Sequence, residues 1–181
     1  DPCKPEDPYG ISKAEAEELV LEYTLSGTIE GVILRPPMVY GPGVKANLLR
    51  LIRGIEAGIP FPLAMVRNQR SMIYVNNLSD AVKTCLVHPK APGQVFFVAD
   101  DEVLSTPELI TLLAGKMGKR ARLIPVPVSI LRLLFSIIGR KGEIDRLTGS
   151  LVVSTKKIKQ ELGWKPPWTL EAGLTATIES Y

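Results

Sequence analysis

The sequence predicts an α/β chain that contains only part of a sheet. In most segments apolar residues recur with the spacing of a helix, and a few short apolar runs have the character of buried strands. These runs are separated by helical segments instead of following one another directly, which is typical of α/β chains. The strands are too few for a complete doubly wound sheet, so we expect a fragment of one.

Composition limits the class of protein. The 181 residues carry 22 Lys and Arg against 19 Asp and Glu, a net charge of +3, and 45% are hydrophobic. This length and this hydrophobic fraction are enough for one domain with a substantial core or for two small lobes. The small, scattered charge argues against a nucleic-acid partner. Cys3 and Cys85 are too few for a disulfide scaffold, and without a targeting segment they favour the cytoplasm.

N-cap residues indicate where the helices begin. Asp7, which a proline follows, is expected to cap the first helix. Asn47 and Asn77 are expected to cap two others, and Ser105 with Glu108 has the spacing of a capping box. The expected helices cover residues 8–26, 47–57, 77–87, 105–118, 130–138, 156–162 and 170–180.

The expected strands are short and apolar, at residues 31–35, 72–75 and 94–99, and residues 124–127 are expected to be extended. Pro36 and Pro37 cannot continue a ladder, so the chain is expected to leave the sheet there and to form a loop over residues 38–43.

The helix expected at residues 130–138 is unusually apolar. A transmembrane helix needs about 20 apolar residues, and this segment is far shorter and contains Arg132. We therefore expect no integral membrane segment and place this helix in the core or between lobes. The lesser alternative is peripheral contact with a membrane.

Tyr9 and Lys13 have a spacing that suggests acid–base chemistry. Residues four apart on a helix are neighbours, and a cation beside a phenol favours the phenolate. A tyrosine so placed can act as a general acid or base. Gly10 leaves room for a ligand to approach closely. The plain alternative is a tyrosine that packs on its own helix.

Four motifs give this spacing a context. They are Tyr-Gly-Ile-Ser-Lys at residues 9–13, Leu-Arg-Pro-Pro-Met-Val-Tyr-Gly-Pro-Gly at 34–43, Arg-Ser-Met-Ile-Tyr-Val-Asn-Asn-Leu-Ser-Asp-Ala at 70–81 and Leu-Gly-Trp-Lys-Pro-Pro at 162–167. In this order they resemble the extended short-chain dehydrogenase/reductases, and among them the nucleotide-sugar epimerases, dehydratases and reductases. The resemblance covers nearly the whole chain.

The resemblance implies a Rossmann-type fold of which only the C-terminal part is present. Residues 1–43 would be the end of the NAD(P)-binding domain, and residues 44–181 the smaller, mostly helical lobe that binds the nucleotide sugar. The main binding motif for NAD or NADP, a glycine-rich turn after a strand, is absent from these residues. The chain also begins at Asp1 without a methionine. We therefore expect a fragment that, alone, neither binds NAD(P) tightly nor turns over.

The resemblance also implies roles for the first two motifs. Tyr9 matches the catalytic tyrosine, which exchanges a proton with the substrate while hydride passes to or from the nicotinamide. Lys13 matches the lysine that holds the nicotinamide ribose. Pro36, Met38 and Val39 match the segment that borders the nicotinamide.

Substrate contacts are implied for Met38, Asn47, Arg70 and Arg146. Asn47 and Arg70 match residues that touch the diphosphate, and Arg146 matches a second arginine more loosely. A guanidinium fork suits phosphate oxygens, so the chemistry agrees. The alternatives are that Asn47 is only a helix cap and that the arginines are solvated surface charges.

Other candidates have plainer explanations. Tyr40 and the two tryptophans could form a nucleobase pocket, but core packing is the default expectation. Cys85 lies on an apolar helical stripe and is expected to be inert packing. No cluster of His, Cys, Asp and Glu has the spacing of metal ligands, so no metal site is expected.

The implied activity is hydride transfer at C4 of a UDP-linked hexose or N-acetylhexosamine, as in a 4-epimerase. Many sugar epimerases carry an asparagine where this chain has Met38, and a thioether cannot replace an amide's hydrogen bonds. The first alternative is therefore a reductase of a UDP-4-keto-6-deoxy sugar, and the second a non-catalytic nucleotide-binding module. The resemblance also implies a homodimer of the full-length enzyme, with Leu19, Val20 and Tyr23 at the interface.

Overall fold

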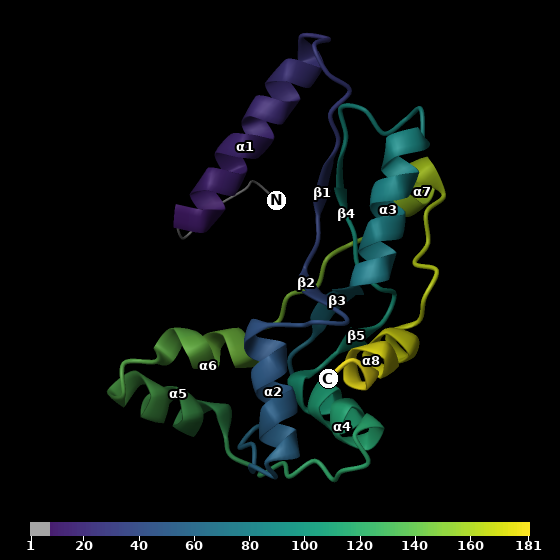
Figure 1. The fold of residues 1–181 in the computed structure, drawn as a ribbon. Helices are drawn as coiled ribbons and strands as arrows, with labels where there is room; N and C mark the ends of the chain where they lie inside the picture. Colours follow the sequence, from purple (N-terminus) through teal and green to yellow (C-terminus); the bar gives the residue numbers. More distant parts are fainter. Residues whose placement is uncertain (1–7) are drawn as a thin grey trace.

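A computed structural model describes residues 8–181, so Cys3 and the expected cap Asp7 lie outside the described residues. The described elements are α1 (Pro8–Leu25), β1 (Ile33–Arg35), β2 (Met38–Tyr40), α2 (Ala46–Glu56), β3 (Arg70–Tyr74), α3 (Val75–Val87), β4 (Val95–Phe97), β5 (Val103–Leu104), α4 (Thr106–Lys116), α5 (Val128–Ile137), α6 (Lys141–Thr148), α7 (Lys156–Leu162) and α8 (Leu170–Glu179). Figure 1 shows their arrangement.

The described strands form two small sheets. In one, β1 and β4 run parallel, with Ile33 opposite Val95. In the other the order is β2-β3-β5, where β2 runs parallel to β3 and β5 antiparallel to it. Parallel strands connected through helices are the signature of an α/β fold, so the predicted fold class is confirmed.

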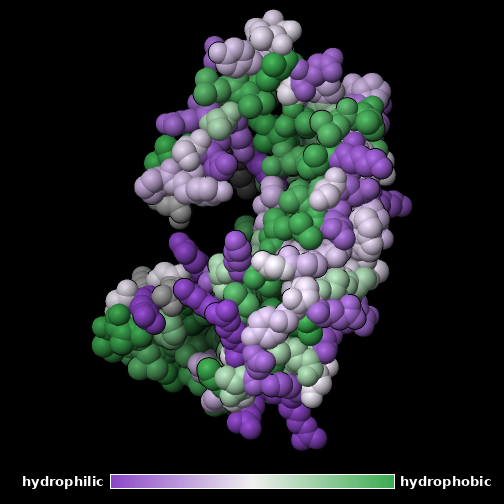
Figure 2. Space-filling view, in the orientation of Figure 1, coloured by the Kyte–Doolittle hydropathy of each residue, from purple (hydrophilic) through white to green (hydrophobic). Residues whose placement is uncertain are grey.

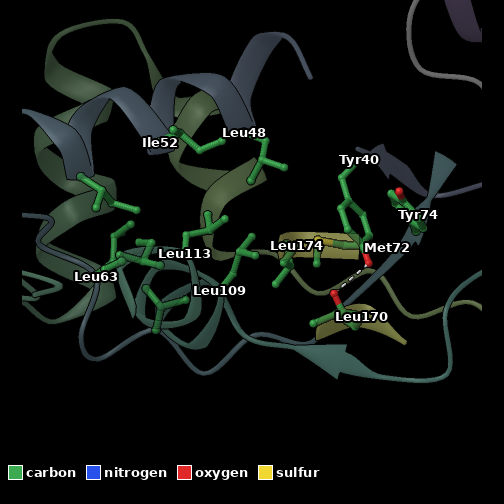
Figure 3. Close-up of a cluster of buried hydrophobic side chains, with 14 of the residues drawn as sticks. Tyr40, Leu48, Ile52, Leu63, Met72, Tyr74, Leu109, Leu113, Leu170 and Leu174 are labelled. Atoms are coloured by element: carbon green, nitrogen blue, oxygen red, sulfur yellow. Dashed lines mark hydrogen bonds between the residues drawn. The ribbon is translucent and has the colours of Figure 1, made fainter. Parts of the chain in front are cut away.

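The larger core lies between α2, α4, α8 and the β2–β3 pair (Figure 3). Leu48 and Ile52 of α2 face Leu109 and Leu113 of α4 across it, and all four side chains are buried. Full burial of such a side chain contributes about 1.5–3 kcal/mol to folding. This packing fixes α2, which carries part of the site described below, against the rest of the lobe.

The second core packs α3 and α7 against β4. Phe96, Cys85, Ile158 and Trp164 are buried in it. Trp164 donates an indole hydrogen bond to Asp80 at 2.9 Å. Burial raises the pKa of the Cys85 thiol, which therefore stays protonated, and the prediction that it is packing is confirmed.

A buried carboxylate lies where the two cores meet. Asp100 follows β4 and accepts hydrogen bonds from the Tyr40 hydroxyl, the Tyr74 amide and the Asn77 side chain. Asn77 also exchanges two hydrogen bonds with the backbone of Trp168, at 2.8 and 2.9 Å. These contacts fix the start of α3 and the approach to α8 against the ends of β2 and β3.

Helix α1 packs more loosely than the other elements near it. None of its residues is buried. It is attached to β1 by an ion pair between Glu17 and Arg35 and, at its other end, by a hydrogen bond from the Gly31 amide to Thr24. Figure 1 shows α1 beside β1, apart from the lobe that contains α2, α4, α5 and α6.

Two expected helix caps are wrong and one is confirmed. α2 begins at Ala46 and α3 at Val75, so Asn47 and Asn77 lie inside the first turns and cap nothing. Their polar side chains are used in the cavity and in the Asp100 network instead. The capping box of α4 forms as predicted, since Ser105 and Glu108 exchange hydrogen bonds through side chain and backbone.

The expected loop at residues 38–43 is partly wrong, because Met38–Tyr40 forms β2. The two prolines end the ladder between β1 and β4, but the chain passes directly into pairing with β3. Helix α6 and the two-residue strand β5 were not expected either. α6 has too few apolar residues to show a helical period, and β5 is too short to show an alternation.

The expected boundary between residues 43 and 44 stays a prediction. Members of the second core come from both sides of it, since Val32 and Leu34 pack against the cluster that contains Phe96 and Trp164. Within residues 8–181, no helix has the length and apolar character needed to cross a bilayer.

Candidate functional site

A cavity of about 400 Å³ lies between α2, α6 and the start of β3 and α4. Four side chains that the sequence predicts as substrate contacts line it together, although they come from four different elements. The lining residues are Met38, Asn47, Leu48, Arg50, Leu51, Phe61, Arg70, Thr106, Leu109, Arg146 and Leu147.

The polar part of this lining is basic. It contains the guanidinium groups of Arg50, Arg70 and Arg146 and the amide of Asn47, and no carboxylate is among the lining side chains. Guanidinium groups bind phosphate oxygens through paired, charge-assisted hydrogen bonds. The remaining lining is largely apolar and suits a flat or partly apolar group. The cavity can therefore receive an anion attached to a less polar body.

Arg70 is positioned by the end of α6. It is the first residue of β3, and its guanidinium donates hydrogen bonds to the carbonyl of Arg146 and, at 3.4 Å, to that of Gly149. The last carbonyls of a helix carry partial negative charge and attract a cation. Burial lowers the pKa of Arg70, which is half-buried. The contact joins two of the predicted diphosphate arginines in one structural unit.

A buried amide fixes the wall of the cavity from behind. The Asn68 side chain donates to the Thr106 hydroxyl at 2.9 Å and to the carbonyls of Leu147 and Gly149 at 3.2 and 3.1 Å. Its oxygen accepts from the Thr106 amide at 2.8 Å. Asn68 thus joins the start of α4 to the end of α6, and it sets the position of Arg146 through the backbone.

Asn47 and Arg50 lie three residues apart on α2. This spacing places both on the helix face that borders the cavity. Both side chains are exposed, as a ligand-contacting group in an open cavity must be. Arg50 was not among the predicted site residues, yet its spacing from Asn47 was a signal that could have identified it. Asn68 and Thr106 gave no such signal, because their role depends on contacts that are distant in sequence.

The predicted nicotinamide segment is divided by the structure. Met38 is half-buried and lines the cavity, where it lies opposite Met72 in the ladder with β3. Pro36 and Val39 are exposed and do not line it. Successive residues of a strand point to opposite faces, so the side chains of Met38 and Val39 lie on opposite faces of the sheet. The predicted contacts of Pro36, Met38 and Val39 with the nicotinamide stay predictions.

Tyr9 and Lys13 are neighbours on the first turns of α1. The Lys13 ammonium nitrogen lies 5.6 Å from the centroid of the Tyr9 ring, so the predicted pairing of the two side chains is present. The Tyr9 side chain is 71% exposed, and neither residue lines the cavity. The expected acid–base pair and the expected substrate contacts are therefore two separate groups among the described residues.

Two other expectations concern aromatic rings and metals. Tyr40 and Trp164 are buried in the cores and form no nucleobase pocket, while Trp168 packs edge-on against Tyr74. In the part of the chain that the structure describes, no group of three or more His, Cys, Asp or Glu side chains is placed to hold a metal ion.

Several known proteins are similar to this chain in sequence. The NAD dependent epimerase/dehydratase family matches residues 1–99. A UDP-glucose 4-epimerase from Vibrio cholerae is 43% identical over 178 residues, which are 98% of this chain and 54% of that protein. An Arabidopsis thaliana 3beta-hydroxysteroid-dehydrogenase/decarboxylase is 27% identical over 99% of this chain and 36% of that protein. The chain thus spans about half the length, or less, of these two relatives.

The fold is shared with solved structures. The crystal structure of a UDP-glucuronic acid 4-epimerase from Bacillus cereus, in complex with NAD, superposes with a TM-score of 0.75 at 23% identity, over 98% of this chain and 52% of that one. At this identity the match shows the fold alone, a Rossmann-type fold of which this chain corresponds to about half. Together, the family match and the 43% identical relative show that this chain belongs to the NAD dependent epimerase/dehydratase family.

Proposed function

We propose that this chain is the C-terminal portion of an NAD(P)-dependent nucleotide-sugar 4-epimerase acting on a UDP-linked hexose or N-acetylhexosamine. The observation that carries the proposal is the cavity in which Arg50, Arg70, Arg146 and Asn47 meet without a carboxylate. The substrate diphosphate would lie among these groups, and the nucleoside would contact the apolar lining. The UDP-glucose 4-epimerase relative supports this choice of substrate class.

In this proposal Tyr9 acts as the acid and base. Its ionised phenolate oxygen would take the proton of the sugar C4 hydroxyl as the hydride leaves C4, and the phenol so formed would return that proton to the oxygen of the 4-ketone when the hydride comes back. Lys13, whose ammonium nitrogen lies 5.6 Å from the centroid of the Tyr9 ring, would bond the ribose of the cofactor and supply positive charge beside the reacting groups. Because neither side chain lines the cavity, the sugar must extend from the cavity toward α1.

The cofactor follows from the family. NAD(P), when bound, supplies the acceptor for the hydride that leaves C4. The phenol and ammonium group on one face of α1 fit its nicotinamide ribose, and both are open to a ligand. Residues 1–181 contain no glycine-rich turn for its pyrophosphate, so we propose that this chain alone neither holds NAD(P) tightly nor turns over.

One assembly and one location are part of the proposal. The full-length enzyme would be a homodimer that uses α1, where Leu19 and Tyr23 are about half exposed and Val20 is partly buried. The cytoplasm is the proposed location, because nucleotide sugars are soluble and the buried Cys85 is a free thiol.

The experiment is an assay of the longer enzyme on UDP-N-acetylglucosamine and on its 4-keto-6-deoxy derivative. An epimerase converts the first without net use of NAD(P)H, while a reductase consumes one NAD(P)H for each molecule of the second. Tyr9→Phe should lower turnover at least 100-fold and leave UDP affinity unchanged. Tyr181→Phe is the matched control, because Tyr181 is 48% exposed and does not line the cavity. Full activity of Tyr9→Phe would contradict the role of Tyr9 as the acid and base. Turnover of neither substrate by the longer protein would instead support a non-catalytic nucleotide-binding module.

A further inference from the structure

Helix α5 is apolar on two sides, and only one of them is used by the fold. Leu131 is 3% exposed and Phe135 is partly buried, and both pack against the larger core. A second set of large apolar side chains on the same helix is exposed to solvent by 47 to 74%. This set, the α5 stripe, consists of Ile130, Leu133, Leu134, Ile137 and the C-cap residue Ile138.

The α5 stripe is one continuous face of the helix. Its members follow one another at intervals of three, one, three and one residues, which is the spacing of a single apolar face. Figure 2 shows a green area over α5 at the lower left, on the side turned away from α1. Single exposed leucines are ordinary, but a contiguous patch of this kind marks a surface that something covers.

Basic groups accompany the α5 stripe. Residues 128–149 carry four Lys or Arg against two Asp or Glu, a local charge of 4 − 2 = +2. Arg132, on the side of α5 opposite the stripe, forms an ion pair with Asp145 at 3.2 Å and is still half exposed. An apolar face with a basic residue on the opposite face is a feature of helices that lie in the interface of an anionic bilayer.

The size of the α5 stripe favours a bilayer surface over a protein partner. α5 has 10 residues, and a helix of that length extends about 15 Å, too short to cross a membrane. Five partly exposed side chains also supply less than the roughly 800 Å² that each partner contributes to a stable protein interface. Insertion to a depth of about 5–10 Å needs only such a short face.

We propose that the α5 stripe inserts into the surface of an anionic bilayer and makes this protein a peripheral membrane protein. α6 packs against α5 and supplies Arg146 and Leu147 to the cavity. Insertion of the α5 stripe therefore holds the cavity next to the membrane surface. The inference does not depend on the proposed reaction, because it concerns a face that no residue of the cavity shares.

The test is flotation of the 181-residue chain with vesicles of phosphatidylcholine and phosphatidylglycerol in a 3:1 ratio, and with pure phosphatidylcholine. The protein should float with the anionic vesicles and at least 5-fold less with the neutral ones. Leu133→Asn combined with Ile137→Asn should lower the partition coefficient at least 10-fold. The matched control is Leu86→Asn with Val87→Asn on α3, where two apolar side chains are 77% and 78% exposed.

Circular dichroism melting verifies that each variant is folded. We expect all of them to fold, because the four replaced side chains are exposed and their replacement leaves the cores intact. The proposal is overturned if the unmodified chain stays with the soluble fraction. It is equally overturned if both double variants lose binding alike, or if light scattering shows a dimer that only the α5 variant dissociates. UDP affinity, measured on the same samples, reports on the proposed function separately.

Discussion

The hydroxyl of Tyr40 donates a hydrogen bond to the carboxylate of Asp100 at 2.7 Å, between side chains that are 1% and 4% exposed. The two residues are 60 positions apart in the sequence. A buried carboxylate is costly unless its oxygens are paired. Here Tyr40, the Tyr74 amide and Asn77 supply the donors, so this contact joins the end of β2 to the end of β4 and the two cores to each other.

Removal of the Tyr40 hydroxyl should destabilise the fold. Tyr40→Phe leaves Asp100 one donor short, which costs about 1–3 kcal/mol of unfolding free energy for a buried polar group. Urea unfolding monitored by circular dichroism measures it. Tyr23→Phe on α1, where the ring is 52% exposed, is the control and should leave the transition unchanged. Equal midpoints for the two variants would show that the Tyr40–Asp100 bond does not hold the cores together.

Asp100 should also give stability a characteristic pH dependence. Burial raises the pKa of Asp100 above its ordinary value of 3.8, against the opposing effect of its hydrogen bonds. The folded state then binds the proton more tightly than the unfolded state. The contribution of Asp100 to the unfolding free energy is largest below pH 3.8. It is lost as the pH rises through the pKa that Asp100 has in the folded state.

The measurement is the difference in unfolding free energy between the unmodified chain and Asp100→Asn across this range. The unfolding free energy of the unmodified chain minus that of Asp100→Asn should decrease as the pH rises from 3.8. Asp100→Asn should be less stable than the unmodified chain across the whole range, because its amide cannot accept all the hydrogen bonds. A difference that increases with pH would mean that the hydrogen bonds outweigh burial.

Two glycine substitutions should change the stability of the fold in opposite directions. A Cβ on Gly173 of α8 would lie 2.8 Å from both the Tyr40 hydroxyl and the Tyr74 ring, so Gly173→Ala should cost about 1–3 kcal/mol through overpacking. A Cβ on Gly115 of α4 meets nothing within 4 Å. Gly115→Ala should therefore stabilise the helix by about 0.5–1 kcal/mol. Thermal melting of both variants measures the pair, and a destabilised Gly115→Ala would refute the packing described for α4.

Arg50 should contribute to nucleotide affinity although sequence did not select it. Arg50→Gln removes a charged donor from the cavity, which corresponds to about 10-fold or more in affinity for a charge-assisted hydrogen bond. Arg53→Gln is the matched control, because Arg53 is exposed on the same helix and does not line the cavity. Calorimetric titration with UDP measures both. Equal losses would indicate a general charge effect and no specific contact.

Helix and strand positions were largely predictable because they depend on local signals. The capping box at Ser105 and the ends of α7 follow from residues adjacent in sequence. Asn47 and Asn77 have the residue type of a cap, yet they lie two and three residues after the actual cap positions, Lys45 and Tyr74. The Asn77 side chain bonds Asp100 and Trp168 instead, contacts that are distant in sequence. Met38–Tyr40 was not predictable as a strand, since its partner β3 is contributed from more than 30 residues further along.

The site was predictable only as far as its residues match a family pattern. Met38, Asn47, Arg70 and Arg146 were identified by resemblance, and the structure brings all four to one cavity. Asn68 was not identified, because its function is to satisfy carbonyls about 80 residues away. The exposed face of α5 was equally hidden, since an apolar helix in a sequence does not reveal which of its sides the core will cover.

The central claim is that the cavity binds the diphosphate of a nucleotide, and calorimetry with UDP and with uridine tests it most directly. Arg50, Arg70, Arg146 and Asn47, the polar groups proposed to hold the diphosphate, all lie in this chain, so the 181 residues alone should bind UDP. Uridine, which lacks the diphosphate, should bind at least 10-fold more weakly, and Arg146→Gln should reduce that preference. Equal affinity for UDP and uridine, or no binding of UDP by the folded chain, would contradict the claim.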